Sequence, residues 1–227
     1  SKNHKNKKLK NTKIEEIKEN IPSFLKTNYI VYALLFVIMA LAFYIRAVLP
    51  WNATFANGIT VFATDDAVYH MRLVENFITN FPHKLTYDAY TLYPYGSVLT
   101  WGYFYDFIIG VLALIFGVNN LNVVGALVPA IMGTLIVIPI YFIGSEILNK
   151  KAGLFGAFII AILPGSFLQR SMLGFTDHHA AEVLFSTLFM MYFLFAFNRV
   201  KCVPEKFFSM KSLKFIVSTP LKYAVLS

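Results

Sequence analysis

The chain of 227 residues is 57% hydrophobic and only 14% charged, whereas about 25% of the residues in soluble domains are charged. With a mean hydropathy of +0.60, this composition excludes an ordinary soluble domain and indicates a protein that crosses the membrane several times. The net charge of +8 can signal nucleic-acid binding, but no aromatic residues interleave with the N-terminal lysines, so we expect no nucleic-acid partner.

A lysine-rich arm, residues 1–27, precedes the first long apolar run. Positive charge flanking a span favours the cytoplasmic side of the membrane, and contact with anionic lipids is an additional role for this arm. The uncharged run Tyr29–Ile45 follows, and with its flanks it is long enough to cross a bilayer. We therefore predict that the N-terminus is cytoplasmic and that the chain is external from Pro50 onward.

The positions of lysines decide which of the next four apolar segments cross the membrane. Lys150 and Lys151 separate two of these segments, and a second basic cluster follows Phe197. Both basic clusters lie in the cytoplasm only if the short segment Phe107–Val118 does not cross. Because a run of this length rarely spans a bilayer, we expect this segment to be an external helix associated with the membrane.

The resulting prediction is an all-α polytopic transmembrane bundle with a long external first loop that contains amphipathic helices. In chain order, its parts are the cytoplasmic arm (1–27), a first span (28–48), external loop 1 (49–121), a second span (122–147), a third span (152–168), external loop 2 (169–180), a fourth span (182–198), a cytoplasmic segment (199–213) and a fifth span (214–227) that the sequence cuts short.

Two adjacent acids, Asp65 and Asp66, follow Thr64 at the start of an amphipathic helical pattern in external loop 1. Capping by Thr64 or Asp65 and complementarity to the helix dipole explain acids at this place, and a functional carboxylate is the alternative. His70 lies one turn after Asp66 on the same face, where a histidine is more often packed than ligating.

An aromatic belt follows in the same loop, around a turn at Pro94-Tyr95-Gly96, and it includes Trp101. Anchoring at the membrane interface is the simpler interpretation of these rings, and stacking on a ligand is the alternative.

The motif Asp177-His178-His179 lies between two apolar segments, on the predicted external loop 2. Carboxylates and imidazoles are rare near membrane spans unless they have a function. Asp177 and His179 offer an oxygen and a nitrogen to one divalent cation, and Arg170 lies on the same connection. Since the predicted topology places this loop on the same side as Asp66, the two acids are candidate ligands of one metal.

Taken in order, these motifs resemble the catalytic subunit of oligosaccharyltransferase, most closely its archaeal form, the dolichyl-phosphooligosaccharide–protein glycotransferases. The matched pieces are Asp65–Arg72, Tyr93-Pro94-Tyr95-Gly96, Pro164-Gly165, Arg170, Gly174-Phe175 and Asp177–His179. The resemblance covers about residues 28–198 and implies a transmembrane bundle of the GT-C glycosyltransferase type.

The resemblance also implies roles for individual residues. Asp66, Asp177 and His179 would bind a divalent metal, and Asp66 would be catalytic through its contact with the acceptor asparagine amide. Arg170, also catalytic, would pair with the carboxylates or with the substrate diphosphate, as its planar guanidinium allows. The expected substrate contacts are Arg170, His178, Tyr95 and Trp101. The family implies a divalent metal, and we expect Mn²⁺ or Mg²⁺, with Zn²⁺ also compatible. This chain has histidine in place of the second acid of the family's acid-x-acid motif, which favours Mn²⁺ or Zn²⁺ over Mg²⁺.

The implied reaction moves an oligosaccharide from a dolichyl (di)phosphate carrier to asparagine in Asn-x-Ser/Thr, at the external face of the cell membrane. A later catalytic glutamate and a C-terminal domain with Trp-Trp-Asp-Tyr-Gly belong to the family but not to this sequence. We therefore expect an N-terminal part that does not transfer glycan alone. The alternatives are another membrane glycosyltransferase that uses a polyprenyl-phosphate sugar, a secondary transporter, against which the lack of an internal repeat argues, and a non-catalytic scaffold.

Overall fold

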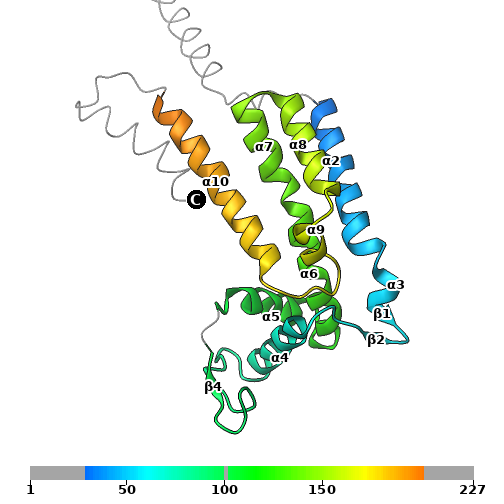
Figure 1. Cartoon of the computed structure of the whole chain (residues 1–227), viewed down its shortest axis with the longest axis vertical. Helices are drawn as coiled ribbons and strands as arrows, with labels where there is room; N and C mark the ends of the chain where they lie inside the picture. The colour runs from blue at the N-terminus through cyan, green and yellow to red at the C-terminus, as the bar shows by residue number, and fades with distance from the viewer. Residues whose placement is uncertain (1–28, 100–101, 202–227) are drawn as a thin grey trace, which may run out of the picture.

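The computed structural model describes residues 29–99 and 102–201. Helices α2, α7, α8 and α10 run lengthwise as a bundle, and α4 and α5 lie together at one end of it (Figure 1). The predictions for the basic arm, Trp101, the cytoplasmic segment after residue 201 and the fifth span fall outside the described residues.

The first apolar run forms one long helix. It consists of α2 (Tyr29–Phe43), the π-helical turn η2 (Tyr44–Val48) and α3 (Trp51–Thr54). Together they give an apolar helix of 26 residues, which is long enough to cross a membrane. The described part of the predicted first span 28–48, residues 29–48, lies within it.

A second long helix begins with the 3-10 turn η3 (Val118–Asn120) and continues through α6 (Leu121–Leu135) and α7 (Val137–Ile147). Its 30 residues contain the predicted second span, 122–147. The helix is interrupted at Ile136, close to Pro139. Proline lacks a backbone N–H, so Pro139 cannot donate to the carbonyl of Leu135, four residues before it.

Helix α8 (Lys150–Ile162) is shorter than the predicted third span, 152–168. Asn149 starts it, because its side-chain oxygen accepts the N–H groups of Lys151 and Ala152, both at 3.0 Å. The helix ends at Ile162 because Leu163 precedes Pro164 and takes an extended conformation, as residues before proline commonly do. A separate short helix, α9 (Ser166–Arg170), follows.

Helices α7 and α8 pack closely as an antiparallel pair. A Cβ atom at Gly153 would collide with the Ser145 hydroxyl and the Tyr141 carbonyl, so only glycine permits this approach. Helix α10 (His179–Lys201) packs against α6 and α7. With the two long helices above, its segment 179–199 makes three helices, among the described residues, that have the length and composition of a membrane span.

The segment predicted as external loop 1 has α4 (Asp65–Thr79) and α5 (Phe104–Phe116) as its main helices. Two short antiparallel hairpins, which the all-α prediction did not include, complete it: β1 (Phe55–Ala56) with β2 (Ile59–Thr60), and β3 (Tyr87–Asp88) with β4 (Ser97–Val98). Helix α5 is apolar but has only 13 residues. Its position relative to the membrane, and the direction in which each helix crosses, stay predictions.

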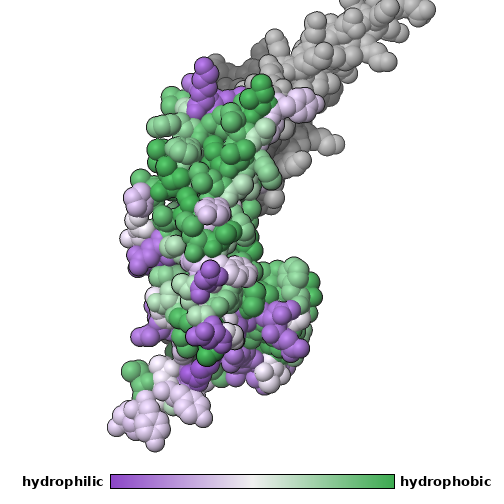
Figure 2. Space-filling view, turned by 90° about the vertical axis from the view of Figure 1, so that its right-hand side faces the viewer, coloured by the Kyte–Doolittle hydropathy of each residue, from purple (hydrophilic) through white to green (hydrophobic). Residues whose placement is uncertain are grey.

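The protein has two hydrophobic cores and an apolar outer surface (Figure 2). One core lies between α4, α5, α6 and α10 and includes Met71, Ile109 and Val128. The other lies between α2, α7 and α8. Figure 2 shows hydrophobic residues over the bundle and hydrophilic ones gathered at the end where α4 lies. An apolar outer surface on a bundle of this kind suits contact with lipid.

Candidate metal centre

Helix α4 carries the first part of the site. Its N-terminus is capped by Thr64, whose hydroxyl accepts the Ala67 N–H at 3.2 Å. Asp65 and Asp66 lie in the first turn and are exposed. One turn later, His70 is 1% exposed. The predicted amphipathic helix is therefore confirmed, and its buried face brings His70 into the protein.

The segment that carries Asp177 is held by hydrogen bonds to two other parts of the chain, α6 and α3. The Gly174 N–H donates to the Ala126 carbonyl of α6 at 3.0 Å. The Thr176 hydroxyl donates to the Gly125 carbonyl at 2.9 Å, and the Thr54 hydroxyl of α3 donates to Leu173. These contacts fix the backbone just before Asp177.

Arg46, which is fully buried in η2, holds the same segment from the bundle side. Its Nε donates to the Ser171 hydroxyl at 3.0 Å, and its two terminal nitrogens donate to the carbonyls of Ala161 at 2.8 Å and Ile160 at 3.1 Å. The Arg46 carbonyl accepts the Leu173 N–H at 2.8 Å. A single guanidinium thus ties the end of α8 to the chain that leads to Asp177.

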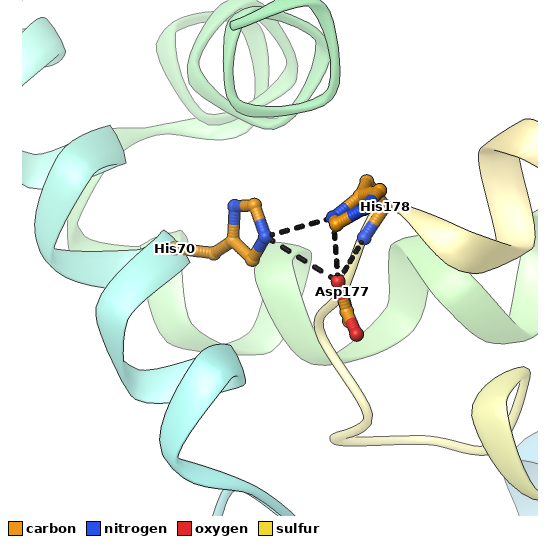
Figure 3. A group of neighbouring side chains, drawn as sticks. All are labelled: His70, Asp177 and His178. Carbon is orange, nitrogen blue, oxygen red and sulfur yellow. Dashed lines mark hydrogen bonds and ion pairs between the residues drawn. The ribbon is translucent and has the colours of Figure 1, made fainter. Parts of the chain in front are cut away.

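At the centre of the site, His70 and His178 meet the same oxygen of Asp177 (Figure 3). His70 Nε2 lies 3.4 Å from Asp177 Oδ1, and His178 Nδ1 lies 2.7 Å from the same oxygen. The two imidazoles are 3.3 Å apart at these nitrogens. Asp177 is only 3% exposed, so its carboxylate is buried.

The other oxygen of Asp177 faces His179. The distance from His179 Nε2 to Asp177 Oδ2 is 3.3 Å. Glu182, one turn into α10, adds a second carboxylate: its Oε2 lies 3.0 Å from His179 Nδ1 and its Oε1 lies 3.7 Å from His178 Nε2. Both histidines are about one-third exposed at their side chains. This side of the cluster is therefore open to the surface.

A second buried carboxylate, Asp106 of α5, lies behind His70. Its Oδ1 is 2.6 Å from His70 Nδ1, and both side chains are almost fully buried. Burial by itself lowers the pKa of the His70 imidazole, but the hydrogen bond and charge of Asp106, with the charge of Asp177, outweigh burial. The pKa of His70 therefore lies above its ordinary value.

The donor atoms of this cluster fit a divalent cation. Two overlapping groups have ligand atoms within 4.8 Å of one another: His70, Asp177 and His178, and His178, His179 and Glu182. Mixed imidazole and carboxylate donors suit Zn²⁺ or Mn²⁺ better than Ca²⁺, which prefers oxygen alone.

The structure brings together three of the predicted site residues, Asp177, His178 and His179. Asp66 is in neither metal-capable group of the described residues. Arg170, at the end of α9, is exposed and forms no ion pair within that part of the chain. Tyr95 is 85% exposed on the β3–β4 hairpin. The roles of Asp66, Arg170 and Tyr95 stay predictions.

The sequence interpretation left four members out of the site. It took His70 to be packed rather than ligating, and two of the other three, Glu182 and Arg46, left a signal. Glu182 lies three and four residues after His179 and His178, which is the spacing of neighbours on a helix face. Arg46 interrupts an apolar run, where a charge usually has a function. Asp106 gave no signal of its own, because its pairing with His70 depends on how α5 packs against α4.

A cavity of about 470 Å³ opens beside the cluster, between α5 and the first turns of α10. His178 and Glu182 supply its polar side, and Phe104 and Phe185 supply apolar walls. A ligand that carries both a charged group and a hydrocarbon chain matches such a surface.

Comparison with known proteins gives a consistent family. The family model described as oligosaccharyl transferase STT3, N-terminal, matches residues 31–227. Dolichyl-phosphooligosaccharide-protein glycotransferase 3 of Archaeoglobus fulgidus is 41% identical over 160 residues, which cover 69% of this chain and 18% of that relative. Dolichyl-monophosphooligosaccharide–protein glycotransferase AglB of Haloferax volcanii is 36% identical over 186 residues, which cover 78% of this chain and 18% of that relative. The chain thus spans about a fifth of these relatives.

Solved structures agree. The archaeal oligosaccharyltransferase AglB from Archaeoglobus fulgidus, in complex with an inhibitory peptide and a dolichol-phosphate, matches with a TM-score of 0.74 and 35% identity, over 88% of this chain and 24% of that one. The Archaeoglobus fulgidus oligosaccharyltransferase in complex with Zn and sulfate matches with a TM-score of 0.71 and 35% identity, over 86% of this chain and 25% of that one.

Proposed function

The chain belongs to the STT3 N-terminal family of oligosaccharyl transferases, and from this we propose that it forms part of the active site of a protein N-glycosylation enzyme. The proposed reaction transfers an oligosaccharide from a dolichyl (di)phosphate carrier to asparagine in Asn-x-Ser/Thr. The main support for the proposal is that Asp177 contacts His178 and His179 and lies beside the buried His70.

The bundle that holds this site is, in our proposal, of the GT-C glycosyltransferase type. Its support is the TM-score of 0.74 to the archaeal AglB structure. The α7–α8 turn and the C-terminal end of α10 lie at one end of the bundle, and the start of α10 lies at the other (Figure 1). Since Lys150, Lys151 and Arg199 lie at or near those first two places, the positive-inside rule favours an external site and a cytoplasmic N-terminus.

The proposed metal ligands are Asp66, Asp177 and His179. Asp177 Oδ2 and His179 Nε2 lie on the open side of the cluster, and a bound divalent cation supplies positive charge that stabilises the departing (di)phosphate. The nitrogen donor favours Mn²⁺ or Zn²⁺ over Mg²⁺. A relative's structure in complex with Zn supports this choice.

The acceptor asparagine needs activation, because the lone pair of an amide nitrogen is delocalised into its carbonyl. Carboxylates that accept the amide N–H groups turn the nitrogen out of conjugation, and we assign one such contact to Asp66, which is exposed on the first turn of α4. The nitrogen then bonds to the anomeric carbon, the bond from that carbon to the phosphate oxygen breaks, the dolichyl (di)phosphate leaves with the electron pair of that bond, and one amide proton passes to water.

The lipid-linked donor is assigned to the cavity beside His178. Phe104 and Phe185 offer apolar walls for a polyprenyl chain, and His178 offers a hydrogen-bond donor to phosphate. We assign Arg170 to the phosphate as well, on charge alone. Relatives support both substrates, since their structures hold a dolichol-phosphate in one case and a tethered peptide with the NVT sequon in another.

The test uses the full-length protein that contains this chain, with Mn²⁺, a dolichyl-linked oligosaccharide and a peptide that carries Asn-x-Thr. We expect a glycopeptide whose mass increases by one oligosaccharide. A matched peptide with Gln in place of Asn controls for the nucleophile. Glycosylation of both peptides, or of neither by folded protein, would contradict the proposed function.

A further inference from the structure

Asp106 and His70 form a buried pair that the proposed reaction does not use. Both side chains are almost fully buried, and their atoms Oδ1 and Nδ1 are 2.6 Å apart. Among the described residues, no lysine or arginine forms an ion pair with Asp106. Removing a carboxylate from water is costly, and a buried pair is therefore weak evidence for a purely stabilising role.

The second ring nitrogen of His70 connects this pair to the metal cluster. Nε2 lies 3.4 Å from Asp177 Oδ1 and 3.3 Å from His178 Nδ1. The chain of contacts therefore runs from Asp106 of α5 through His70 of α4 to Asp177 Oδ1, just before α10. Figure 3 shows its part from His70 to Asp177 and His178.

The two oxygens of Asp177 have different surroundings. Oδ1 is contacted by His70, by the His178 ring and by the His178 backbone N–H at 2.7 Å. Oδ2 faces His179 on the open side. A carboxylate that is held at one oxygen keeps the other oxygen fixed in direction, and such outer contacts orient metal ligands in many sites.

His70 Nε2 is itself close enough to the other donor atoms to be a ligand, but it contacts Asp177 Oδ1, whereas His179 faces Oδ2. We therefore propose that His70 and Asp106 are positioning residues of a metal centre formed at Oδ2 and His179. Asp106 fixes the orientation of the His70 ring, and His70 holds Asp177 and His178 from the buried side, so that Asp177 Oδ2 and His179 meet one cation. The inference rests on the proposed function only in taking this cluster as the metal centre. It adds two residues that do not touch the substrate.

Packing supports the same assignment. Helix α5 lies against α4 and α6, and Gly110 of α5 faces the Phe77 ring so closely that a Cβ atom would collide with it. The Tyr105 ring stands edge-on to the His70 ring, with centroids 5.5 Å apart. The His70 ring is thus confined by a neighbouring ring as well as by Asp106, which limits its rotation.

Four variants of the full-length protein test the proposal. His70→Phe keeps an aromatic ring and removes both nitrogens. His70→Gln keeps one polar group near the position of Nε2. Asp106→Asn keeps the shape and removes the charge. Tyr105→Phe is the control, because its hydroxyl has no hydrogen-bond partner among the described residues and its removal leaves the His70 contacts intact.

The measurement is Mn²⁺ affinity by electron paramagnetic resonance titration without donor or peptide, beside thermal unfolding of each variant. We expect His70→Phe to weaken Mn²⁺ binding by about 10–100-fold, the usual effect of removing an outer-shell partner. We expect Asp106→Asn to weaken it in the same direction. His70→Gln should bind more tightly than His70→Phe, and Tyr105→Phe should bind as the wild type does.

Wild-type affinity in folded His70→Phe and Asp106→Asn would overturn the inference. The inference would also be overturned if His70→Phe and His70→Gln lost the same Mn²⁺ affinity and if this loss followed their loss of thermal stability. A merely structural role of His70 gives that result. If the wild type transfers glycan while His70→Phe binds Mn²⁺ normally, only this inference fails. If the wild type binds Mn²⁺ in a His70-dependent way but transfers nothing, the proposed function fails and this inference stands.

Discussion

His179 Nε2 lies 3.3 Å from Asp177 Oδ2, on the side of the cluster that is open to the surface. His179 is the first residue of α10 and Asp177 precedes it by two positions, and their donor atoms differ in kind. A carboxylate oxygen accepts any hard divalent cation, whereas an imidazole nitrogen selects for transition metals and zinc. This pair therefore decides which metals the proposed centre accepts.

Replacing His179 by an acid should change the metal preference. His179→Asp gives an acid-x-acid motif, and oxygen donors suit Mg²⁺ better than imidazole does. We expect the ratio of Mg²⁺-supported to Mn²⁺-supported glycan transfer by the chelator-treated, full-length protein to rise relative to the wild type. An unchanged ratio would show that His179 is not a metal ligand.

The two adjacent acids of α4 should behave differently. Both Asp65 and Asp66 are exposed in the first turn of the helix, so neither contributes much to folding. We expect Asp66→Ala to reduce glycan transfer by about 10²–10³-fold, the usual cost of losing one group that stabilises a transition state. Asp65→Ala is the matched control and should retain most of the rate. The reverse result would assign the role to Asp65.

Much of the fold could be predicted from local sequence. The lengths of the apolar runs predicted the long helices. Thr64 and the two acids after it predicted the start of α4, which the structure confirms. The motif Asp177-x-His179 lies within three residues, so its members are close in any fold. These features depend on neighbours along the chain, and such neighbours are visible in a sequence.

The remaining features depend on tertiary contacts. Asp106 and His70 are 36 positions apart, and nothing in the sequence says which side of α5 faces α4. Arg46 meets Ser171 across 125 positions. The hairpins of external loop 1 have only two residues in each strand, which is too short for an alternating pattern.

Removing the Arg46 guanidinium should destabilise the protein and disturb the site. Its hydrogen bonds to the Ala161 carbonyl and to Ser171 are buried and the one to the Ile160 carbonyl is partly buried, and each bond to a charged group contributes about 1.5–3 kcal/mol. We expect Arg46→Met to lower the free energy of unfolding by at least about 3 kcal/mol. Thermal unfolding in detergent measures the loss.

Arg46→Lys tests whether charge alone is sufficient. An ammonium group lacks the planar fork of a guanidinium, so we expect it to restore only part of the stability. Full recovery with lysine would mean that the separate contacts to Ser171 and to α8 contribute little.

The β3–β4 hairpin should open at acid pH. The Arg72 hydrogen bond and contacts from Tyr90, Thr91 and Tyr69 hold the pKa of the buried Asp88 carboxyl well below its usual range, although burial opposes them. A carboxyl whose folded pKa is depressed stabilises the fold above its unfolded pKa of about 3.9, and this stabilisation is lost as the pH falls.

Hydrogen exchange of the hairpin amides between pH 6 and pH 3 measures this effect after correction for the intrinsic exchange rates. We expect protection to fall in the lower part of that range in the wild type. Asp88→Asn should show weaker protection that does not change with pH, because its amide does not titrate. Identical pH profiles in both proteins would argue against Asp88 as the titrating group.

The most direct test of the proposed active site is the rate of glycopeptide formation by the full-length wild type and by Asp177→Ala, measured by mass spectrometry with Mn²⁺, a dolichyl-linked oligosaccharide and an Asn-x-Thr peptide. Asp177 is the residue that both sides of the cluster share. We predict product from the wild type and a rate at least about 100-fold lower from a folded Asp177→Ala protein. Equal rates from the two proteins would contradict the assignment of this cluster to the reaction.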